Sequence, residues 1–293
     1  MLPDMIEQRN KRPYVNLGCG ERYHPEWINI DFCPNTPEVI KYDLKKGIPL
    51  ADKSCDVVYH SALLEHFRKQ DAVLFMRECH RVLRPDGIIR VATPDLERIC
   101  KIYLEKLEAV LKGDHKQKDD YDWILLEMYD QAVREQSGGE ILAYLRQDPL
   151  PNESFIYERI GQEGRNIVFG LRNRSKTFFK QTPSSYLRRA LCEIKNLRSV
   201  FQNQILKVLI GSYGMQALEI GRFRLSGEGH HWMYDRYSLA KLMCEVGFKY
   251  PIQQSAAKSQ IPNWSRYNLD ILSDGIIIKP DSFFMEAIKP GSE

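Results

Sequence analysis

Two glycines and a carboxylate near the N-terminus have the types and the spacing of a nucleoside-binding site. A short apolar run ends abruptly at Gly18-Cys19-Gly20, and a second apolar run ends at Asp31. Glycine permits the positive φ of a tight turn and leaves no Cβ between a ligand and the backbone. A carboxylate at the end of the next strand can accept hydrogen bonds from two ribose hydroxyls. The stretch therefore predicts two buried strands joined by a ligand-binding turn.

The fingerprint of dinucleotide-binding sites is incomplete here, which disfavours NAD and FAD. The third glycine position holds Tyr23, and Asp31 comes earlier than the offset of about 20 residues expected for NAD. Only about six residues separate the turn from the second strand, too few for a crossover helix. A pyrophosphate favours a helix N-terminus, which such a connection lacks. The site suits a nucleoside without phosphates, such as S-adenosylmethionine (SAM), unless the turn merely connects two strands.

The pattern of strands continues toward the C-terminus of this region. Residues 39–44 read as a third strand that ends in an acid, and residues 55–60 as a fourth. A helix over residues 69–84 has an apolar face and leads through Pro85-Asp86-Gly87 into a fifth strand. Repeated alternation of strands and helices predicts a mostly parallel sheet with helices on both faces.

The series of motifs resembles the class I SAM-dependent methyltransferases of the methyltransferase type 11 kind, the branch that includes ubiquinone-biosynthesis C-methyltransferases. The matching pieces are VNLGCG, INID, YDLKKGIPLADKSCDVVYHSALLEH and RVLRPDGIIRVATPD, within residues 14–95. Near the C-terminus, GEGHHWMYDRYSLAKLMCEVGF and DGIIIKPDSFFMEAIKP resemble segments of small bacterial methyltransferases linked to glycan biosynthesis. The resemblance implies a Rossmann-like α/β fold of seven mostly parallel strands, the last of them antiparallel and inserted between strands five and six.

The resemblance also implies SAM as the cofactor and assigns its binding residues to the ends of the first four strands. These residues are Asn16, Gly18, Cys19, Gly20, Asp31, Asp43, Leu44, His60 and Ser61. We expect the three turn residues to line the methionine and ribose, Asp31 to bind the ribose hydroxyls, and His60 and Ser61 to lie near the methionine. Asp43 should accept from the adenine amino group, beside the backbone N–H of Leu44. The amide at Asn16 can accept a hydrogen bond but brings no counter-charge for the ammonium or sulfonium.

Two histidines are the candidate catalytic residues. His66 follows the fourth strand, and an imidazole that titrates near pH 6.5 can take a proton from a hydroxyl in the transition state. The alternative is that His66 is a helix-face histidine bonded to a neighbouring carbonyl. His231 follows the glycine-containing residues 227–229, which read as the mobile entry to a lid.

The adjacent histidines raise the question of a metal. A metal site needs at least three ligands at a suitable spacing. Glu228 with His230 or Asp235 does not follow a recognised ligand spacing. The sequence therefore predicts no metal site.

Three segments are expected along the chain. Residues 1–95 form the SAM-binding half of the methyltransferase domain, residues 96–228 a mainly helical insertion on the substrate side, and residues 229–293 the C-terminal part of the domain. Within the insertion, residues 161–185 read as a loop and residues 186–220 as an amphipathic helix.

The insertion is electrically asymmetric. Residues 97–163 carry fifteen acids and nine Lys or Arg, whereas residues 164–225 carry twelve Lys or Arg and two acids. The two segments can pack on each other or face solvent, or the basic one can meet an anionic partner. A basic amphipathic helix can also lie on a membrane surface, although its apolar stripe suits packing on its own protein.

Composition sets the outer limits of the function. The chain of 293 residues is 43% hydrophobic, has seven scattered cysteines without a CxxC pair, and shows no signal peptide or membrane-spanning run. We therefore expect a cytoplasmic protein with reduced thiols and at most peripheral membrane contact, in an oligomeric state that the sequence leaves open.

The predicted activity is methyl transfer from SAM to a small molecule. A hydroxyl of a sugar or glycan intermediate is the favoured acceptor, and basic residues in the insertion would suit an anionic one. One alternative is a nucleic-acid methyltransferase, although residues 60–63 lack the Asn/Asp-Pro-Pro-aromatic box and no Pro-Cys motif appears. Another alternative is a SAM-binding scaffold protein that has lost catalysis.

Overall fold

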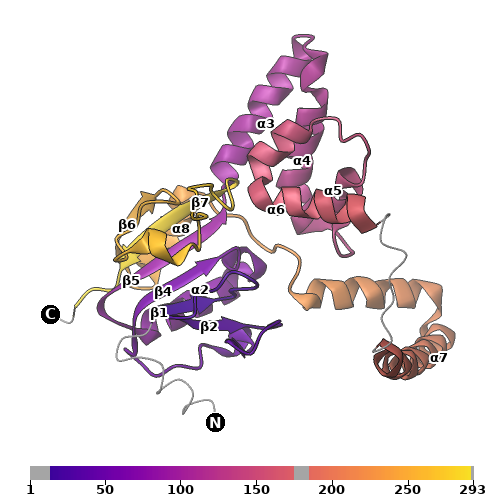
Figure 1. The fold of residues 1–293 in the computed structure, drawn as a ribbon, viewed down its shortest axis with the longest axis horizontal. Coiled ribbons are helices and arrows are strands. Elements are labelled where there is room, and N and C mark those ends of the chain that lie inside the picture. Colours follow the sequence, from indigo (N-terminus) through magenta and orange to yellow (C-terminus); the bar gives the residue numbers. More distant parts are fainter. Residues whose placement is uncertain (1–13, 175–184, 292–293) are drawn as a thin grey trace.

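A seven-stranded sheet forms the body of the computed structural model, which describes residues 14–174 and 185–291 (Figure 1). The strands are β1 (Tyr14–Leu17), β2 (Ile28–Asp31), β3 (Val39–Lys41), β4 (Cys55–Ser61), β5 (Leu83–Pro94), β6 (Lys249–Gln254) and β7 (Ser282–Ile288). Their order is β3-β2-β1-β4-β5-β7-β6. Strands β1 to β5 pair in parallel, and β7 runs antiparallel to both β5 and β6. The antiparallel last strand is confirmed, and it makes the sheet mixed rather than mostly parallel.

The helix predicted over residues 69–84 is present, and the insertion is mainly helical as expected. The α-helices are α2 (Lys69–Val82), α3 (Leu96–Leu111), α4 (Lys118–Val133), α5 (Gly139–Leu145), α6 (Glu153–Arg174), α7 (Ser185–Ser226) and α8 (Arg236–Glu245). Short 3-10 turns are η1 (Leu44–Lys46), η2 (Leu64–His66), η3 (His115–Gln117) and η4 (Trp264–Tyr267). Asp95 begins α3 by accepting from the backbone N–H of Arg98 at 3.0 Å. Within the described residues, β1 and β2 are joined without a helix, as the short connection predicts.

The two faces of the sheet are covered differently. On one face, Val15, Leu17 and Val58 pack in a single cluster with α2 and α8. On the other face, Trp27 and Tyr59 pack against η4 and its neighbours in the connection between β6 and β7. Alternate residues of a strand point to opposite faces, so one strand supplies both clusters. An irregular segment with a 3-10 turn therefore occupies a face where the sequence pattern predicts a helix layer.

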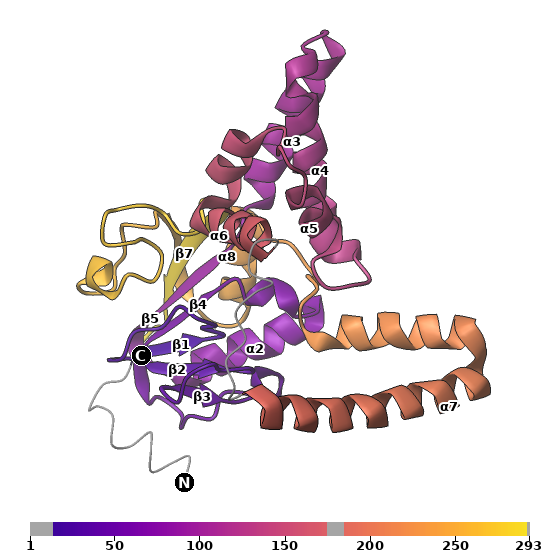
Figure 2. The ribbon, with the colours of Figure 1, turned by 45° about the vertical axis from the view of Figure 1, so that its right-hand side comes forward.

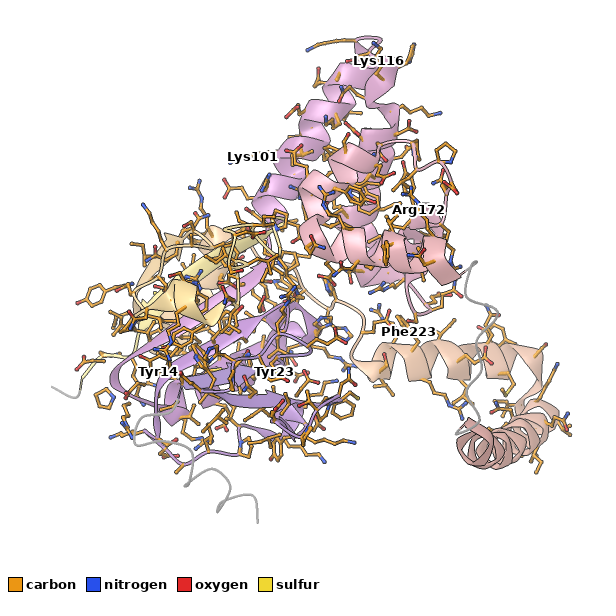
Figure 3. All side chains as sticks on the ribbon, in the orientation of Figure 1. Tyr14, Tyr23, Lys101, Lys116, Arg172 and Phe223 are labelled. Carbon is orange, nitrogen blue, oxygen red and sulfur yellow. The ribbon has the colours of Figure 1, made fainter. Side chains whose placement is uncertain are left out.

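The segment between β5 and β6 is mainly helical and reaches away from the sheet. Helices α3 and α4 form a pair that projects in one direction, and α7 projects in another (Figures 1 and 2). Lys101 lies on α3, and Lys116 lies at the tip of the pair (Figure 3). None of the described helices has the length and apolar character needed to cross a membrane.

The loop predicted over residues 161–185 is wrong for its first part, because α6 continues to Arg174. The helix is interrupted at Gly161, with φ 58° and ψ −140°, where an added Cβ would lie 2.6 Å from the Cδ of Pro280. Close packing on the connection to β7, not a loop, therefore explains this glycine. Residues 175–184 of the predicted loop lie outside the described part of the chain.

A helix is present at the predicted place as α7, and it is interrupted at Gly211. Val208 and Leu209 of its predicted apolar stripe are exposed, so the expected packing on the protein is not found for these residues. The acidic and basic segments of the insertion meet at individual contacts. Arg172 bonds the carboxylate of Glu153 at 2.8 Å within α6, and Arg224 of α7 donates to the carbonyl of Ala132 at 2.7 Å. Figure 3 labels Arg172 on α6.

Candidate active site

Two cavities lie at the carboxyl ends of the parallel strands, and Gly18 lines both of them. The first, here called the Asp31 cavity, has a volume of about 510 Å³ and is lined by Gly18, Asp31, Phe32, Asp43, Leu44 and His66, among others. The second, the Asp270 cavity, has a volume of about 590 Å³ and is lined by Asn16, Cys19, Gly20, Ser61, Lys279 and Asp270, among others. In open α/β sheets, ligands bind outside the carboxyl ends of the strands, so both cavities are in the expected place.

The glycine turn separates the two cavities and is shaped by its two glycines. Gly18 has φ +62° and Gly20 has φ +52°, a region that other residues rarely adopt. A Cβ at Gly18 would lie 2.7 Å from the Cδ1 of Leu63, whereas a Cβ at Gly20 would meet nothing within 4 Å. Gly18 therefore allows Leu63 to pack on the turn, and Gly20 leaves open space beside the backbone.

The carboxylate of Asp31 is held in place by the backbone. One oxygen accepts from the N–H of Gly20 at 2.8 Å, and the other accepts from the N–H of Cys33 at 2.8 Å. A carboxylate oxygen can accept two hydrogen bonds, so each retains capacity for a ligand hydroxyl. The side chain is partly exposed and faces the Asp31 cavity. Such an oriented, acceptor-only group fits the two hydroxyls of a ribose.

Asp43 and Leu44 line the same cavity as Asp31. Asp43 begins η1 by accepting from the N–H of Lys45 at 3.1 Å, which fixes one of its oxygens. The structure thus brings together the residues that were predicted to bind ribose and adenine. The two carboxylates and the apolar Phe32, which all line this cavity, fit an adenosine group.

Asn16 has a structural role in addition to lining the Asp270 cavity. It is 1% exposed, and its Nδ2 donates to the carbonyl of Arg22 at 2.9 Å and to Oδ1 of Asn29 at 3.3 Å. Both amide hydrogens are therefore used to hold the turn. Only the carbonyl oxygen of Asn16 is left to accept from a ligand.

His60 and Ser61 were expected to lie together, but they point in opposite directions. Ser61 lines the Asp270 cavity, whereas the ring of His60 is fully buried 5.3 Å from the ring of Phe75 on α2. Neighbouring side chains of a strand alternate between the faces of the sheet, which the strand prediction itself implied. His60 lines neither cavity, so its predicted proximity to the methionine is not supported by its orientation.

Burial of His60 predicts a pH-dependent stability. Neither ring nitrogen has a hydrogen-bond partner among the described residues, and burial lowers the pKa of this histidine from 6.5 to about 3. Between about pH 6.5 and pH 3, His60 therefore binds a proton in the unfolded chain but stays neutral in the folded chain. The stabilising contribution is complete above about pH 6.5 and falls by about 1.4 kcal/mol for each pH unit below it.

When the pH falls from about 6.5 to about 5, the unmodified chain should lose about 2 kcal/mol of unfolding free energy because of His60. The His60→Leu variant should not show this loss. Urea unfolding at both pH values measures this difference. His115→Leu, on the exposed η3, is the matched control and should follow the unmodified chain. Equal pH dependence in all three proteins would contradict the burial of a neutral His60.

One of the two candidate catalytic histidines, His66, lines a cavity, and the other does not. His66 lines the Asp31 cavity, and its Nδ1 lies 3.3 Å from the carbonyl oxygen of Gly229. Burial lowers the pKa of His66 to about 4, so the ring is neutral at neutral pH. His231 lines neither cavity, and its backbone N–H donates to the carbonyl of Glu65 at 2.7 Å.

Several polar residues of the Asp270 cavity were not predicted from the sequence. Glu163 and Asn166 come from α6, and Asp270 and Lys279 come from the connection between β6 and β7. Glu163 and Asn166 fall in the stretch that was predicted to be a loop, where no helical face could be defined. The DGIIIKP motif that contains Lys279 was noted, but nothing in it indicated a cavity.

The comparisons with known proteins bear on the strands that build both cavities. Residues 16–91 match the model of a methyltransferase domain. The segment contains the glycine turn, Asp31, Asp43 and Ser61, and it implies SAM as the cofactor. The chain is also 33% identical over 101 residues to a probable SAM-dependent methyltransferase of Mycolicibacterium smegmatis, a match over 29% of this chain and 38% of the relative.

A second relative matches the chain over a similar length. A probable SAM-dependent methyltransferase of Mycobacterium tuberculosis is 43% identical over 102 residues, covering 29% of this chain and 36% of that protein. The chain thus matches less than two fifths of the length of these relatives. Among solved structures, the chain aligns with a SAM-dependent methyltransferase, possible histamine N-methyltransferase, of Thermotoga maritima. The alignment covers 98% of this chain and 87% of that chain, with 12% identity and a TM-score of 0.37.

Proposed function

We propose that this chain is a SAM-dependent methyltransferase that methylates a hydroxyl of a small sugar or glycan intermediate. The observation that carries the proposal is the carboxylate of Asp31, fixed by two backbone N–H groups at the mouth of a cavity within the matched methyltransferase segment. The nucleoside of SAM would occupy the Asp31 cavity, with Asp31 on the ribose hydroxyls and Asp43 near the adenine.

The residues around Gly18 would orient the reaction. When bound, SAM supplies a methyl group already activated on a sulfonium, so the protein needs no nucleophile of its own. Cys19, Gly20 and Ser61 lead from the glycine turn into the Asp270 cavity, which lies next to the Asp31 cavity. They would hold the methionine end, and the acceptor would bind beyond them. Positioning and exclusion of water are then the main contributions of the protein.

The lining of the Asp270 cavity supports a hydroxyl-rich acceptor. Asn16, Asn166 and Asp270 offer hydrogen-bond acceptors, and Lys279 offers a cation that can bind a phosphate or carboxylate. Such a set suits the hydroxyls of a sugar and tolerates an anionic group. His66 lines the neighbouring Asp31 cavity and burial lowers its pKa to about 4, so we propose no role for it as the base that accepts the proton of the reacting hydroxyl.

Calorimetric titration with SAM, with NAD as a control, tests the cofactor assignment. We expect SAM to bind and NAD not to bind, followed by methyl transfer to an acceptor found by screening monosaccharides, nucleotide sugars and acidic oligosaccharides. Binding of SAM without transfer to any sugar, nucleic acid or other acceptor would instead favour a scaffold protein. Absence of SAM binding would overturn the proposal as a whole.

Replacing Lys279 by methionine tests the acceptor cavity separately. A charge-assisted hydrogen bond contributes about 1.5–3 kcal/mol, so we expect kcat/KM for the acceptor found by screening to fall about 10–100-fold. SAM affinity should change less than the acceptor kinetics, because Lys279 does not line the Asp31 cavity proposed for the nucleoside, and SAM would reach the Asp270 cavity only with its methionine end. Lys249→Met, at the exposed start of β6, is the control. A loss of SAM affinity with unchanged acceptor kinetics would contradict the assignment of the two cavities.

A further inference from the structure

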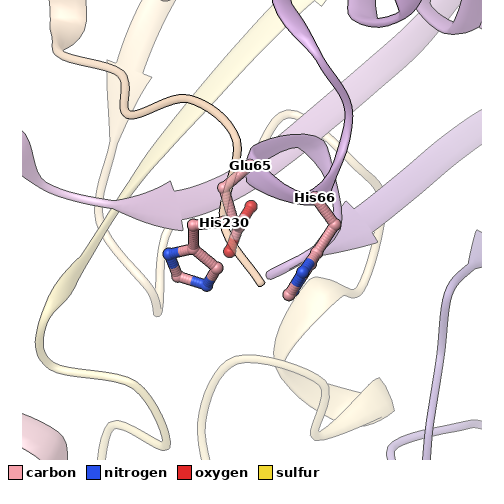
Figure 4. Close-up of side chains that lie close together, drawn as sticks. All are labelled: Glu65, His66 and His230. Atoms are coloured by element: carbon pink, nitrogen blue, oxygen red, sulfur yellow. The ribbon is translucent and has the colours of Figure 1, made fainter. Parts of the chain in front are cut away.

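Three side chains that can bind a metal converge beside the Asp31 cavity (Figure 4). Glu65 and His66 belong to η2, directly after β4, and His230 belongs to the segment that precedes α8. The potential ligand atoms of the three residues all lie within 4.8 Å of one another. The rings of His66 and His230 meet edge to face, with centroids 4.8 Å apart. Residues far apart in the sequence thus form one compact cluster of two imidazoles and a carboxylate.

The carboxylate of Glu65 is incompletely satisfied. The residue is 1% exposed, and its Oε2 accepts a hydrogen bond from the Oγ1 of Thr93 at 3.2 Å. Its Oε1 has no hydrogen-bond partner among the described residues. A buried polar atom without a partner costs free energy, and for a charged oxygen the cost is larger. A cation beside Oε1 would remove this cost.

The hydrogen bonding of His66 suits a metal ligand. Nδ1 of His66 faces the carbonyl oxygen of Gly229, which can only accept, so Nδ1 carries the hydrogen and Nε2 has a free lone pair. Metal-bound histidines typically donate their other ring N–H in this way.

We propose that Glu65, His66 and His230 bind one divalent transition-metal cation. Two imidazoles and one carboxylate are the ligands of zinc sites with three protein ligands and of mononuclear iron(II) sites. Metal–ligand bonds of about 2.0–2.2 Å require ligand atoms closer together than 4.8 Å, so the side chains must close on the cation by small rotations. The site chemistry excludes magnesium and calcium as preferred ions, because these favour oxygen ligands.

A cation in this position would hold one wall of the Asp31 cavity. Ser226, Gly227 and Glu228 line that cavity and directly precede His230 in the chain. The same segment is anchored at η2 by the hydrogen bond from the N–H of His231 to the carbonyl of Glu65. The cation would add a further link between the segment and η2, beside this hydrogen bond and the contact of His66 with the Gly229 carbonyl. Binding of the cation and of a ligand in the Asp31 cavity should therefore be coupled, each strengthening the other.

Titration of the chelator-treated full-length chain with Zn²⁺ tests the proposal. We expect one equivalent to bind, and the midpoint of thermal unfolding to rise with Zn²⁺ concentration because a ligand of the folded state stabilises it. In Glu65→Gln and His230→Gln, Zn²⁺ affinity should fall by at least about 10–100-fold, the loss seen even for residues that only support a ligand. These readouts do not depend on SAM or on methyl transfer, so they are independent of the proposed function.

His231→Gln is the matched control, because this histidine adjoins the cluster and is not part of it. It should bind Zn²⁺ as tightly as the unmodified chain. Far-UV circular dichroism of each variant establishes that it is folded. If Glu65→Gln or His230→Gln does not fold, the other variant still tests the proposal. No Zn²⁺ binding by the unmodified chain, or equal affinity in both folded cluster variants, would overturn the proposal.

Discussion

Replacing Asp31 by alanine is expected to weaken SAM binding by about 1.5–3 kcal/mol, or roughly 10–150-fold in Kd. The substitution removes the carboxylate that would accept from the ribose hydroxyls at the end of β2. It also removes the acceptor that orients the N–H groups of Gly20 and Cys33, so the turn itself should become less ordered. Loss of direct contacts and loss of preorganisation act in the same direction.

Calorimetric titration of both proteins with SAM measures the effect. Asp52→Ala is the control, because this exposed carboxylate precedes β4 and lines neither cavity. It should leave the SAM affinity unchanged. An unchanged affinity in Asp31→Ala would exclude the ribose role of Asp31, even if the chain binds SAM elsewhere.

Replacing Arg90 by methionine is expected to destabilise the fold by about 3–5 kcal/mol, the range for removal of one partner from a buried ion pair. Arg90 is completely buried in β5, with Nε 2.8 Å from Asp270 and Nη1 2.6 Å from Glu286. Its guanidinium also lies 4.5 Å from the centroid of the Trp264 ring. The substitution would leave two buried carboxylates without their cation.

Urea unfolding near neutral pH measures the loss, which should appear as a lower midpoint with an unchanged slope. Arg84→Met is the matched control, because its ion pair with Asp56 is about one third exposed and such pairs contribute about 0–1 kcal/mol. Since Asp270 lines the second cavity, the Arg90 variant should also lose acceptor turnover. A loss of stability no larger than that of the Arg84 variant would contradict the structural role of the cluster.

The local pattern of the first hundred residues determined much of the fold and the nucleoside half of the site. The glycine turn and the position of Asp31 depend on neighbouring residues, and the structure brings Asp31, Asp43 and Leu44 to one cavity as predicted. The missing helix between β1 and β2 followed from chain length alone. His60 was misplaced because strand alternation was not applied to it, although the same local pattern contained that information.

Only the tertiary structure decided the rest of the site. The Asp270 cavity combines β1 and β4 with α6 and with the connection between β6 and β7, and no sequence spacing reports such proximity. The cluster of Glu65, His66 and His230 arises in the same way, because the chain leaves the sheet after β5 and returns beside η2. The hydrophobic periodicity and the turn-forming residues of a sequence report on residues a few positions apart. These contacts depend instead on how separate elements pack. The sequence by itself therefore specified the strand ends and the turn, and long-range packing assembled the second cavity and the proposed metal ligands.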